Sequence, residues 1–212
     1  SAKACEMIMG ITPPYTGNIL RRLIHLGQHI SSHALSFFHL SSPDFLLGWD
    51  SDPVKRNILG VAEKFPDIAR RGIRLRKFGQ EISERVTGKK IHIMGIVPGG
   101  MSFPLTEENR KALLAWVPEA LETTQLGIAM IKKYHQDHAE EVATFANFPT
   151  MYSGTVGPEG ELELYDGKLR FIDSDGKIAI DQLDPKLYLG YIAERVIPWS
   201  YLKYPYYKPY GY

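Results

Sequence analysis

The sequence predicts a mainly helical α+β protein, a bundle of long helices with one small antiparallel β insert. Apolar residues recur at helical spacing through most of residues 1–149, and they alternate at every second position within 150–182. Two Asp-Gly pairs punctuate the alternating stretch and indicate hairpin turns. Residues 183–212 hold a short helix and a tyrosine-rich tail. We expect all three parts to form one incomplete domain.

In the first half, glycine and proline delimit the helices. A first helix should end at Gly10, and Ser42-Pro43 should end the next. That second helix has a wide apolar stripe, which predicts burial on more than one side. The expected spans of the helices after the first are Thr16–Leu40, Pro53–Lys64 and Pro66–Thr87.

In the second half, the helical pattern is interrupted twice. Residues 91–101 predict an extended segment leading into the loop Val97-Pro98-Gly99-Gly100. A helix with acidic residues in its first turn should run from Thr106 to about Phe145, bent near Pro118. After the β insert, Asp184-Pro185 should open a last helix that reaches about Val196.

The composition excludes several classes of protein. Of 212 residues, 25 are basic and 24 acidic, so the net charge of +1 predicts no nucleic-acid partner. The single cysteine, Cys5, excludes an internal disulfide and any site that needs two cysteine ligands from this chain. We interpret Cys5 as a small buried hydrophobe. The sequence has no membrane-spanning apolar run and no signal peptide, which favours a cytoplasmic location.

Both termini predict a fragment of a longer protein. The chain opens within an apparent helix that lacks a capping residue, and five of its last ten residues are tyrosine. We expect these aromatic rings to have nothing to pack against; the alternative is a natural tail that folds back. We expect the exposed apolar surface to cause self-association or dependence on a partner that resembles the small subunit.

Three groups of residues could carry chemistry. His25, His29 and His33 fall on one helical face, where they either bind a metal ion or form hydrogen bonds at a helix contact. His135 and His138 form a weaker pair in a polar stretch that is typical of a solvated face. Arg21 and Arg22 lie on a helix that is otherwise apolar. An arginine there needs a partner, either an internal carboxylate such as Glu6 or Asp44, or a polar site or a neighbouring chain.

Several segments together resemble a known family, the large, catalytic subunit of nickel–iron hydrogenases. The resemblance is strongest to the cytoplasmic, bidirectional, NAD-reducing type and covers essentially all 212 residues. The segments that carry it are Ser1–Glu6, Ile11–Pro14, Ile19–Ile24, Ser32-His33, Phe37–Leu40, Ile91-His92 and Val97–Gly100.

The resemblance implies a fold, an activity and a set of cofactors. It implies a long-helix bundle of the large-subunit type and heterolytic oxidation of dihydrogen coupled to NAD reduction. In that family a nickel–iron centre is held by cysteines of an R-x-C-G-x-C and a D-P-C-x-x-C segment. Both segments are absent here, so the chain is expected to hold no metal ligand and no catalytic residue, and to be inactive alone. Iron–sulfur clusters, flavin and NAD are implied in partners, which are NAD-reducing diaphorase subunits together with the hydrogenase small subunit.

Three residues are expected, from the resemblance, to line or support the cavity around the metals. Arg21 matches an arginine common on this helix. Ser32 stands where many membrane-bound relatives have an aspartate, and His33 follows it. Two other functions remain open at this stage. One is a relative of the quinone-site subunit of complex I, and the other is a His-rich helical protein that binds a metal or haem.

Overall fold

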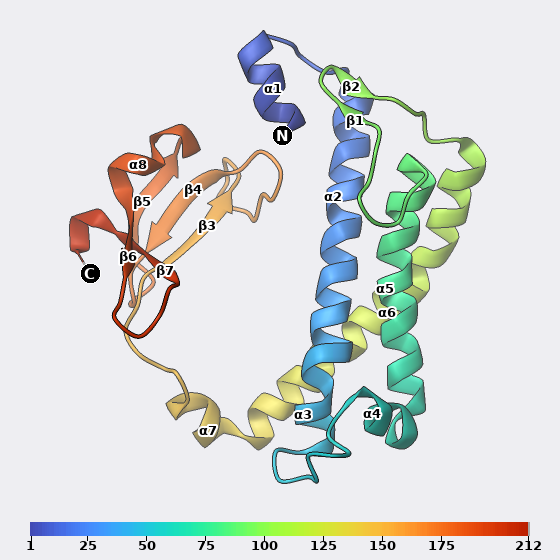
Figure 1. Ribbon diagram of the computed structural model, residues 1–212, viewed down its shortest axis with the longest axis vertical. Coiled ribbons are helices and arrows are strands. Elements are labelled where there is room, and N and C mark those ends of the chain that lie inside the picture. The colour runs from blue at the N-terminus through green and yellow to red at the C-terminus, as the bar shows by residue number, and fades with distance from the viewer. Residues whose placement is uncertain (212) are drawn as a thin grey trace. The chain divides into compact units, whose positions relative to one another are not determined.

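The computed structural model describes residues 1–211, and these divide into two compact units. The first unit is Ser1–Val142 and the second begins at Ala143. Helices dominate the first unit and small antiparallel sheets the second, as the ribbon shows (Figure 1). The chain is therefore an α+β protein, as the sequence predicts. Among residues 1–211, no helix combines the length and the apolarity needed to cross a membrane.

The first unit is built on two long helices that lie side by side, α2 (Tyr15–Leu35) and α5 (Pro66–Thr87) (Figure 1). The helices approach closely because glycines face each other. A Cβ atom on Gly79 would lie 2.4 Å from the carbonyl oxygen of Gly27 and 2.6 Å from the backbone nitrogen of Ser31. Apolar side chains fill the remaining space in two clusters. The buried members of these clusters are Leu20, Ile24, Ala34, Phe38, Leu75, Phe78, Ile82, Val86, Leu113 and Ala120.

The end of α2 differs from the predicted end at Leu40. The α-helix stops at Leu35 and continues as a π-helix, Ser36–Ser41, before the short helix α3, Ser42–Leu47. Pro43 has no backbone N–H and its ring would clash with the preceding helical turn, so the backbone widens instead of continuing as an α-helix. The buried hydroxyl of Ser42 donates to the carbonyl oxygen of Phe38 at 2.8 Å and satisfies a carbonyl in this region.

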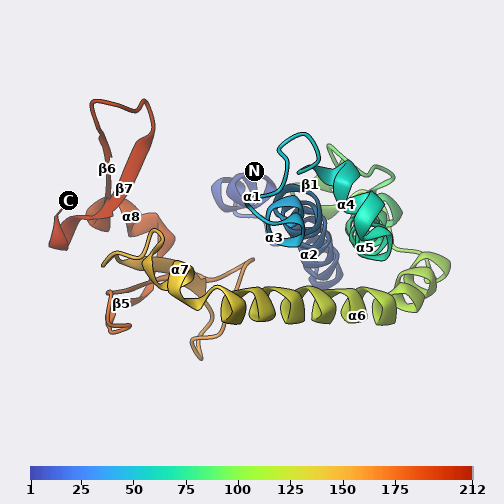
Figure 2. The ribbon, with the colours of Figure 1, turned by 90° about the horizontal axis from the view of Figure 1, so that it is seen from below.

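The remaining helices of the first unit follow the predictions closely, with two corrections. Helix α1 (Ala2–Met9) ends at Gly10 in a left-handed conformation, and α5 ends at Gly88, both as predicted. Helix α4 spans Ile58–Lys64 and not Pro53–Lys64, because the Asn57 side chain accepts hydrogen bonds from the first backbone N–H groups and sets the start there. The predicted helix to Phe145 is two helices, α6 (Glu107–Asp137) and α7 (Ala139–Thr144); Figure 2 shows the length of α6.

The second unit contains two small antiparallel sheets. The predicted meander is confirmed: β3 (Tyr152–Val156), β4 (Lys168–Ile172) and β5 (Ile178–Leu183) pair in the order β3-β4-β5. The tail differs from the prediction. A 3₁₀ turn (Pro185–Leu187) and α8 (Tyr188–Tyr191) end early, and β6 (Ile192–Val196) pairs with β7 (Lys203–Tyr207) before a last 3₁₀ turn, Lys208–Tyr210.

Candidate functional site

A buried ion pair joins α1 to α2. Arg21 is 3% exposed and Glu6 is 4% exposed. The guanidinium of Arg21 donates from Nη1 to Oε2 of Glu6 at 3.0 Å and from Nη2 to Oε1 at 2.6 Å. This two-pronged geometry is the strongest form of an arginine–carboxylate contact. Of the two internal partners that the sequence offers Arg21, the structure selects Glu6; Asp44 instead lies 3.4 Å from Arg56.

The same pair holds the glycine turn between β1 (Ile96–Val97) and β2 (Gly100–Met101). Nη2 of Arg21 donates to the carbonyl oxygens of Val97 at 2.7 Å and Gly100 at 2.9 Å, and the backbone N–H of Gly99 donates to Oε1 of Glu6 at 2.8 Å. The backbone of Gly99 has a φ of 93°, a conformation that favours glycine. We call Glu6, Arg21 and residues 97–100 the arginine clamp.

The electrostatics of the clamp make it a positioning device. The hydrogen bonds from Arg21 hold the pKa of Glu6 below its usual range; burial opposes this shift, and the Gly99 N–H adds to it. Glu6 is therefore ionised at neutral pH and its charge is compensated by Arg21. A carboxylate in this state is a poor general base, so the clamp fixes backbone geometry and does not transfer protons.

Ser32 and His33 lie on the same helix as Arg21 but in a different environment. Both are exposed. Eleven residues make about three helical turns, so Ser32 shares the face of Arg21 but lies roughly 16 Å further along the axis. Nδ1 of His33 is 2.8 Å from the carbonyl oxygen of His29, which turns its ring toward the backbone. The structure therefore does not bring the three predicted cavity residues together within the first unit.

The structure also places His25, His29, His138 and Cys5. Nε2 of His25 and Nε2 of His29 are 3.1 Å apart on half-buried rings. His138 stacks on Tyr134 and its Nδ1 lies 3.5 Å from Glu141, both on an exposed stretch. Cys5 is exposed, which corrects its interpretation as a buried hydrophobe. The sequence pattern misled because α1 buries only Glu6 among residues 2–9.

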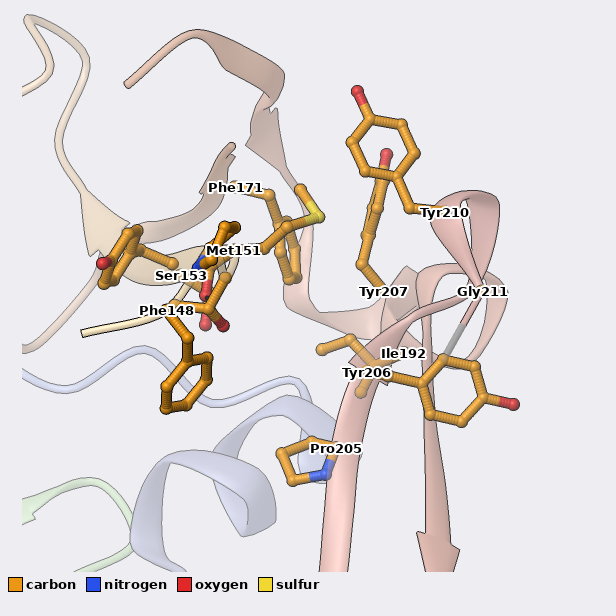
Figure 3. Close-up of a pocket in the computed structure, with 13 residues that line it drawn as sticks. Phe148, Met151, Ser153, Phe171, Ile192, Pro205, Tyr206, Tyr207, Tyr210 and Gly211 are labelled. Carbon is orange, nitrogen blue, oxygen red and sulfur yellow. Dashed lines mark hydrogen bonds between the residues drawn. The ribbon is translucent and has the colours of Figure 1, made fainter. Parts of the chain in front are cut away.

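The second unit contains a cavity of about 520 Å³ lined largely by aromatic rings (Figure 3). Tyr207 stacks on Phe171 at 5.0 Å between ring centroids and lies 6.4 Å from Tyr191, so the tail does find packing partners, contrary to expectation. Burial, together with Tyr210 and Tyr191, raises the pKa of the Tyr207 hydroxyl. The cavity offers ring faces and hydroxyl donors. Its remaining lining residues are Phe148, Pro149, Thr150, Met151, Tyr152, Ser153, Ile192, Pro205, Tyr206 and Gly211.

The residues of this chain do not fit a nickel–iron centre or an iron–sulfur cluster. Such clusters are held by several cysteine thiolates, and the sequence has one cysteine. Within residues 1–211, no three His, Cys, Asp or Glu side chains gather in a metal-binding group. We therefore derive no redox step through this chain.

Comparison with known proteins gives matches along the whole chain, although no family model matches it. The chain is 44% identical over 212 residues to the A-type subunit of the F420-non-reducing hydrogenase vhu of Methanocaldococcus jannaschii, covering all of this chain and 50% of that protein. It is 36% identical over 224 residues to the beta-type subunit of the NAD-reducing hydrogenase HoxS of Cupriavidus necator, covering 99% of this chain and 45% of that protein. The chain thus spans about half the length of the curated relatives that it matches.

A solved structure agrees with these relatives. The crystal structure of an NAD⁺-reducing [NiFe]-hydrogenase in the H₂-reduced state matches with a TM-score of 0.94 and 43% identity, over 99% of this chain and 47% of that one. The fold of this chain is therefore that of a segment of the matched hydrogenase chain.

These names correct the expectation of a large, catalytic subunit. The relatives are named as A-type or beta-type subunits, and one from Archaeoglobus profundus, 32% identical, is named an iron–sulfur subunit of the A type. The assignment to the large subunit is therefore wrong, and neither its bundle type nor a nickel–iron centre in its parent is supported. The residue motifs pointed to hydrogenases, as the names of the relatives do, but they did not distinguish one subunit from another.

Proposed function

We propose that this chain forms part of a hydrogenase, an oxidoreductase complex, as a portion of an A- or beta-type subunit. The observation that carries the proposal is the match along the whole chain, in both sequence and fold, to hydrogenase subunits. The matched length is about half of each relative, so we ascribe the activity to the whole complex and not to these residues alone.

Within that complex, the arginine clamp supplies rigidity. Five hydrogen bonds among Glu6, Arg21 and the turn at Val97–Gly100 tie α1, α2 and the β1–β2 turn into one body. Ser32 and His33 are exposed on the same helix, so their proposed role at a cavity requires other residues of the complex to cover them. Arg21 is a positioning residue, and none of the three transfers a proton or an electron in the proposal.

The exposed apolar side chains of α1 support contact with partner subunits. Ile8 is 86% exposed, Met7 is 60% exposed and Met9 is 52% exposed on consecutive positions of one short helix. Exposed apolar groups of this kind are typical of protein–protein interfaces. We propose that the electron acceptor is set by such partners, since the relatives include both NAD-reducing and F420-non-reducing enzymes.

The proposal is tested by purifying the tagged, natural gene product that contains these residues from its own host. We expect it to bring down other hydrogenase subunits and to reduce an artificial electron-acceptor dye in the presence of dihydrogen. Substituting NAD⁺ for the dye then identifies the NAD-reducing type. A purified complex without dihydrogen-dependent reduction of any acceptor, from cells in which deletion of the gene leaves hydrogenase activity intact, would refute the proposal.

The residue roles are tested in the same complex. Arg21→Met should lower activity together with thermal stability, because it releases the turn. Arg70→Ala is the matched control: Arg70 lies on α5 in an exposed ion pair with Asp67 and should leave both quantities unchanged.

A further inference from the structure

The strongest feature outside the clamp is the histidine pair, His25 and His29. They are separated by four positions on α2, so their side chains leave the helix on one face, one turn apart. Nε2 of His25 and Nε2 of His29 are 3.1 Å apart, and the ring centroids are 4.5 Å apart with the planes at 84°. The clamp does not use either ring.

We propose that the histidine pair is a bidentate binding site for a divalent transition-metal ion of the zinc, nickel or copper class. Nitrogen ligands lie about 2.0–2.1 Å from such an ion. Two of them are then about 2.9 Å apart at a right angle and about 3.4 Å apart at the tetrahedral angle. The observed separation of 3.1 Å lies between these values. In the metal-free pair it is a hydrogen bond between the two ring nitrogens, and both become ligands when each ring carries its proton on Nδ1.

The type of ligand indicates which ions the pair binds. Neutral imidazole is the form that binds metals. Imidazole selects zinc, nickel and copper, whereas magnesium and calcium prefer oxygen ligands.

The site supplies two protein ligands, and water or an added ligand completes the shell. Among residues 1–211 no third His, Cys, Asp or Glu side chain completes a group. His33 is not part of the pair, because its ring centroid is 5.8 Å from that of His29, whereas the rings of His25 and His29 are 4.5 Å apart. We therefore expect one ion per chain with modest affinity.

The experiment is a calorimetric titration of the 212-residue chain with zinc sulfate at about pH 7.5. We expect one Zn²⁺ to bind, and His25→Ala or His29→Ala to weaken binding about tenfold or more, because a chelating pair gains its affinity from the second ligand. Two matched controls should change the affinity less than about twofold. They are His33→Ala, on the same helix, and the double variant His135→Ala/His138→Ala, the other histidine pair of the chain.

A second measurement needs no substitution. In ¹⁵N NMR spectra of the histidine rings, substoichiometric Zn²⁺ should shift the Nε2 signals of His25 and His29 and leave those of His135 and His138 in place. The proposal is overturned by the absence of binding, by loss of binding in the His135/His138 variant, or by shifts confined to other histidines. These outcomes are independent of hydrogenase activity and do not depend on the proposed function.

Discussion

Arg21 and Ser32 lie on almost the same face of helix α2, about three turns apart, but Arg21 is buried and Ser32 is exposed. Arg21 is enclosed by Glu6 of α1 and by the β1–β2 turn, whereas Ser32 is exposed. The helix itself is equally regular at both positions. The difference therefore comes from segments remote in sequence, 15 residues away for Glu6 and 79 residues away for Gly100. Burial of a polar residue on this helix depends on its partners and not on the helical pattern.

The largest loss of stability should follow from a substitution of Arg21, at the enclosed end of α2. Arg21→Met leaves the carboxylate of Glu6 buried without its charged partner and removes two hydrogen bonds to the turn. We expect the melting temperature of the chain to fall by roughly 5–15 °C, measured by circular dichroism.

The double variant Glu6→Gln/Arg21→Met sharpens this test. It removes the uncompensated charge, so it should be more stable than Arg21→Met alone. Equal melting temperatures for wild type and Arg21→Met would contradict the importance of the clamp.

The sequence predicted much of this arrangement, and the missing parts have two kinds of cause, local signals that were missed and contacts between distant segments. Glycine and proline gave the ends of α1 and α5 correctly, because caps act within a few residues. Glu6 was one of two partners proposed for Arg21, but its contact with Gly99 depends on a segment 93 residues away. Three of the wrong starts and ends, at Pro53, Leu40 and Val196, depend on the Asn57 cap, on a π-helix and on the pairing of β6 with β7. The Asn57 cap and the π-helix before Pro43 are local signals that the prediction missed, whereas local patterns do not encode the pairing of β6 with β7.

The second largest loss of stability should come from Gly79 of α5, which packs against the middle of α2. In Gly79→Ala the new methyl group would lie 2.4 Å from a backbone oxygen of Gly27, and backbone atoms cannot rotate away. The helices must separate, and we expect a loss of about 1–3 kcal/mol in the free energy of unfolding by urea.

Gly190→Ala is the matched control for that variant. Gly190 also lies in a helix, but a Cβ atom there meets nothing within 4 Å. It should change the stability of the chain by less than about 0.5 kcal/mol. Similar losses in both variants would mean that close packing does not hold the two long helices together.

The third effect is a pH dependence of the stability, which arises from the Glu6 carboxylate at the enclosed end of α2. The pKa of Glu6 in the folded chain lies below its ordinary value near 4.5, so the unfolded chain takes up the proton first as the pH falls. The stabilisation that ionised Glu6 contributes is complete above about pH 5, and it is lost as the pH falls below 4.5 toward the pKa of Glu6 in the folded chain. In urea titrations between about pH 6 and pH 3, Glu6→Gln should therefore lose less stability with acid than the wild type.

An exposed carboxylate provides the contrast for Glu6. Hydrogen bonds from Arg110 also lower the pKa of Glu107, but this pair is solvent-accessible. High salt should therefore remove most of the difference between wild type and Glu107→Gln, and leave the difference for Glu6→Gln. Salt sensitivity of the Glu6 effect would argue that solvent enters the clamp.

The smallest change in stability should be found at Ser32, toward the exposed end of α2. Ser32→Ala removes an exposed hydroxyl and should change the free energy of unfolding by less than about 0.5 kcal/mol. Ser42→Ala is the comparison, because the buried hydroxyl of Ser42 donates to Phe38 and its loss should cost about 1 kcal/mol. If Ser32→Ala nevertheless lowers dihydrogen oxidation by the intact complex, its role arises from residues that the complex places over this end of the helix. If activity is unchanged as well, the proposed role of Ser32 at a cavity is wrong, and the functional importance of α2 is confined to the end that holds Arg21.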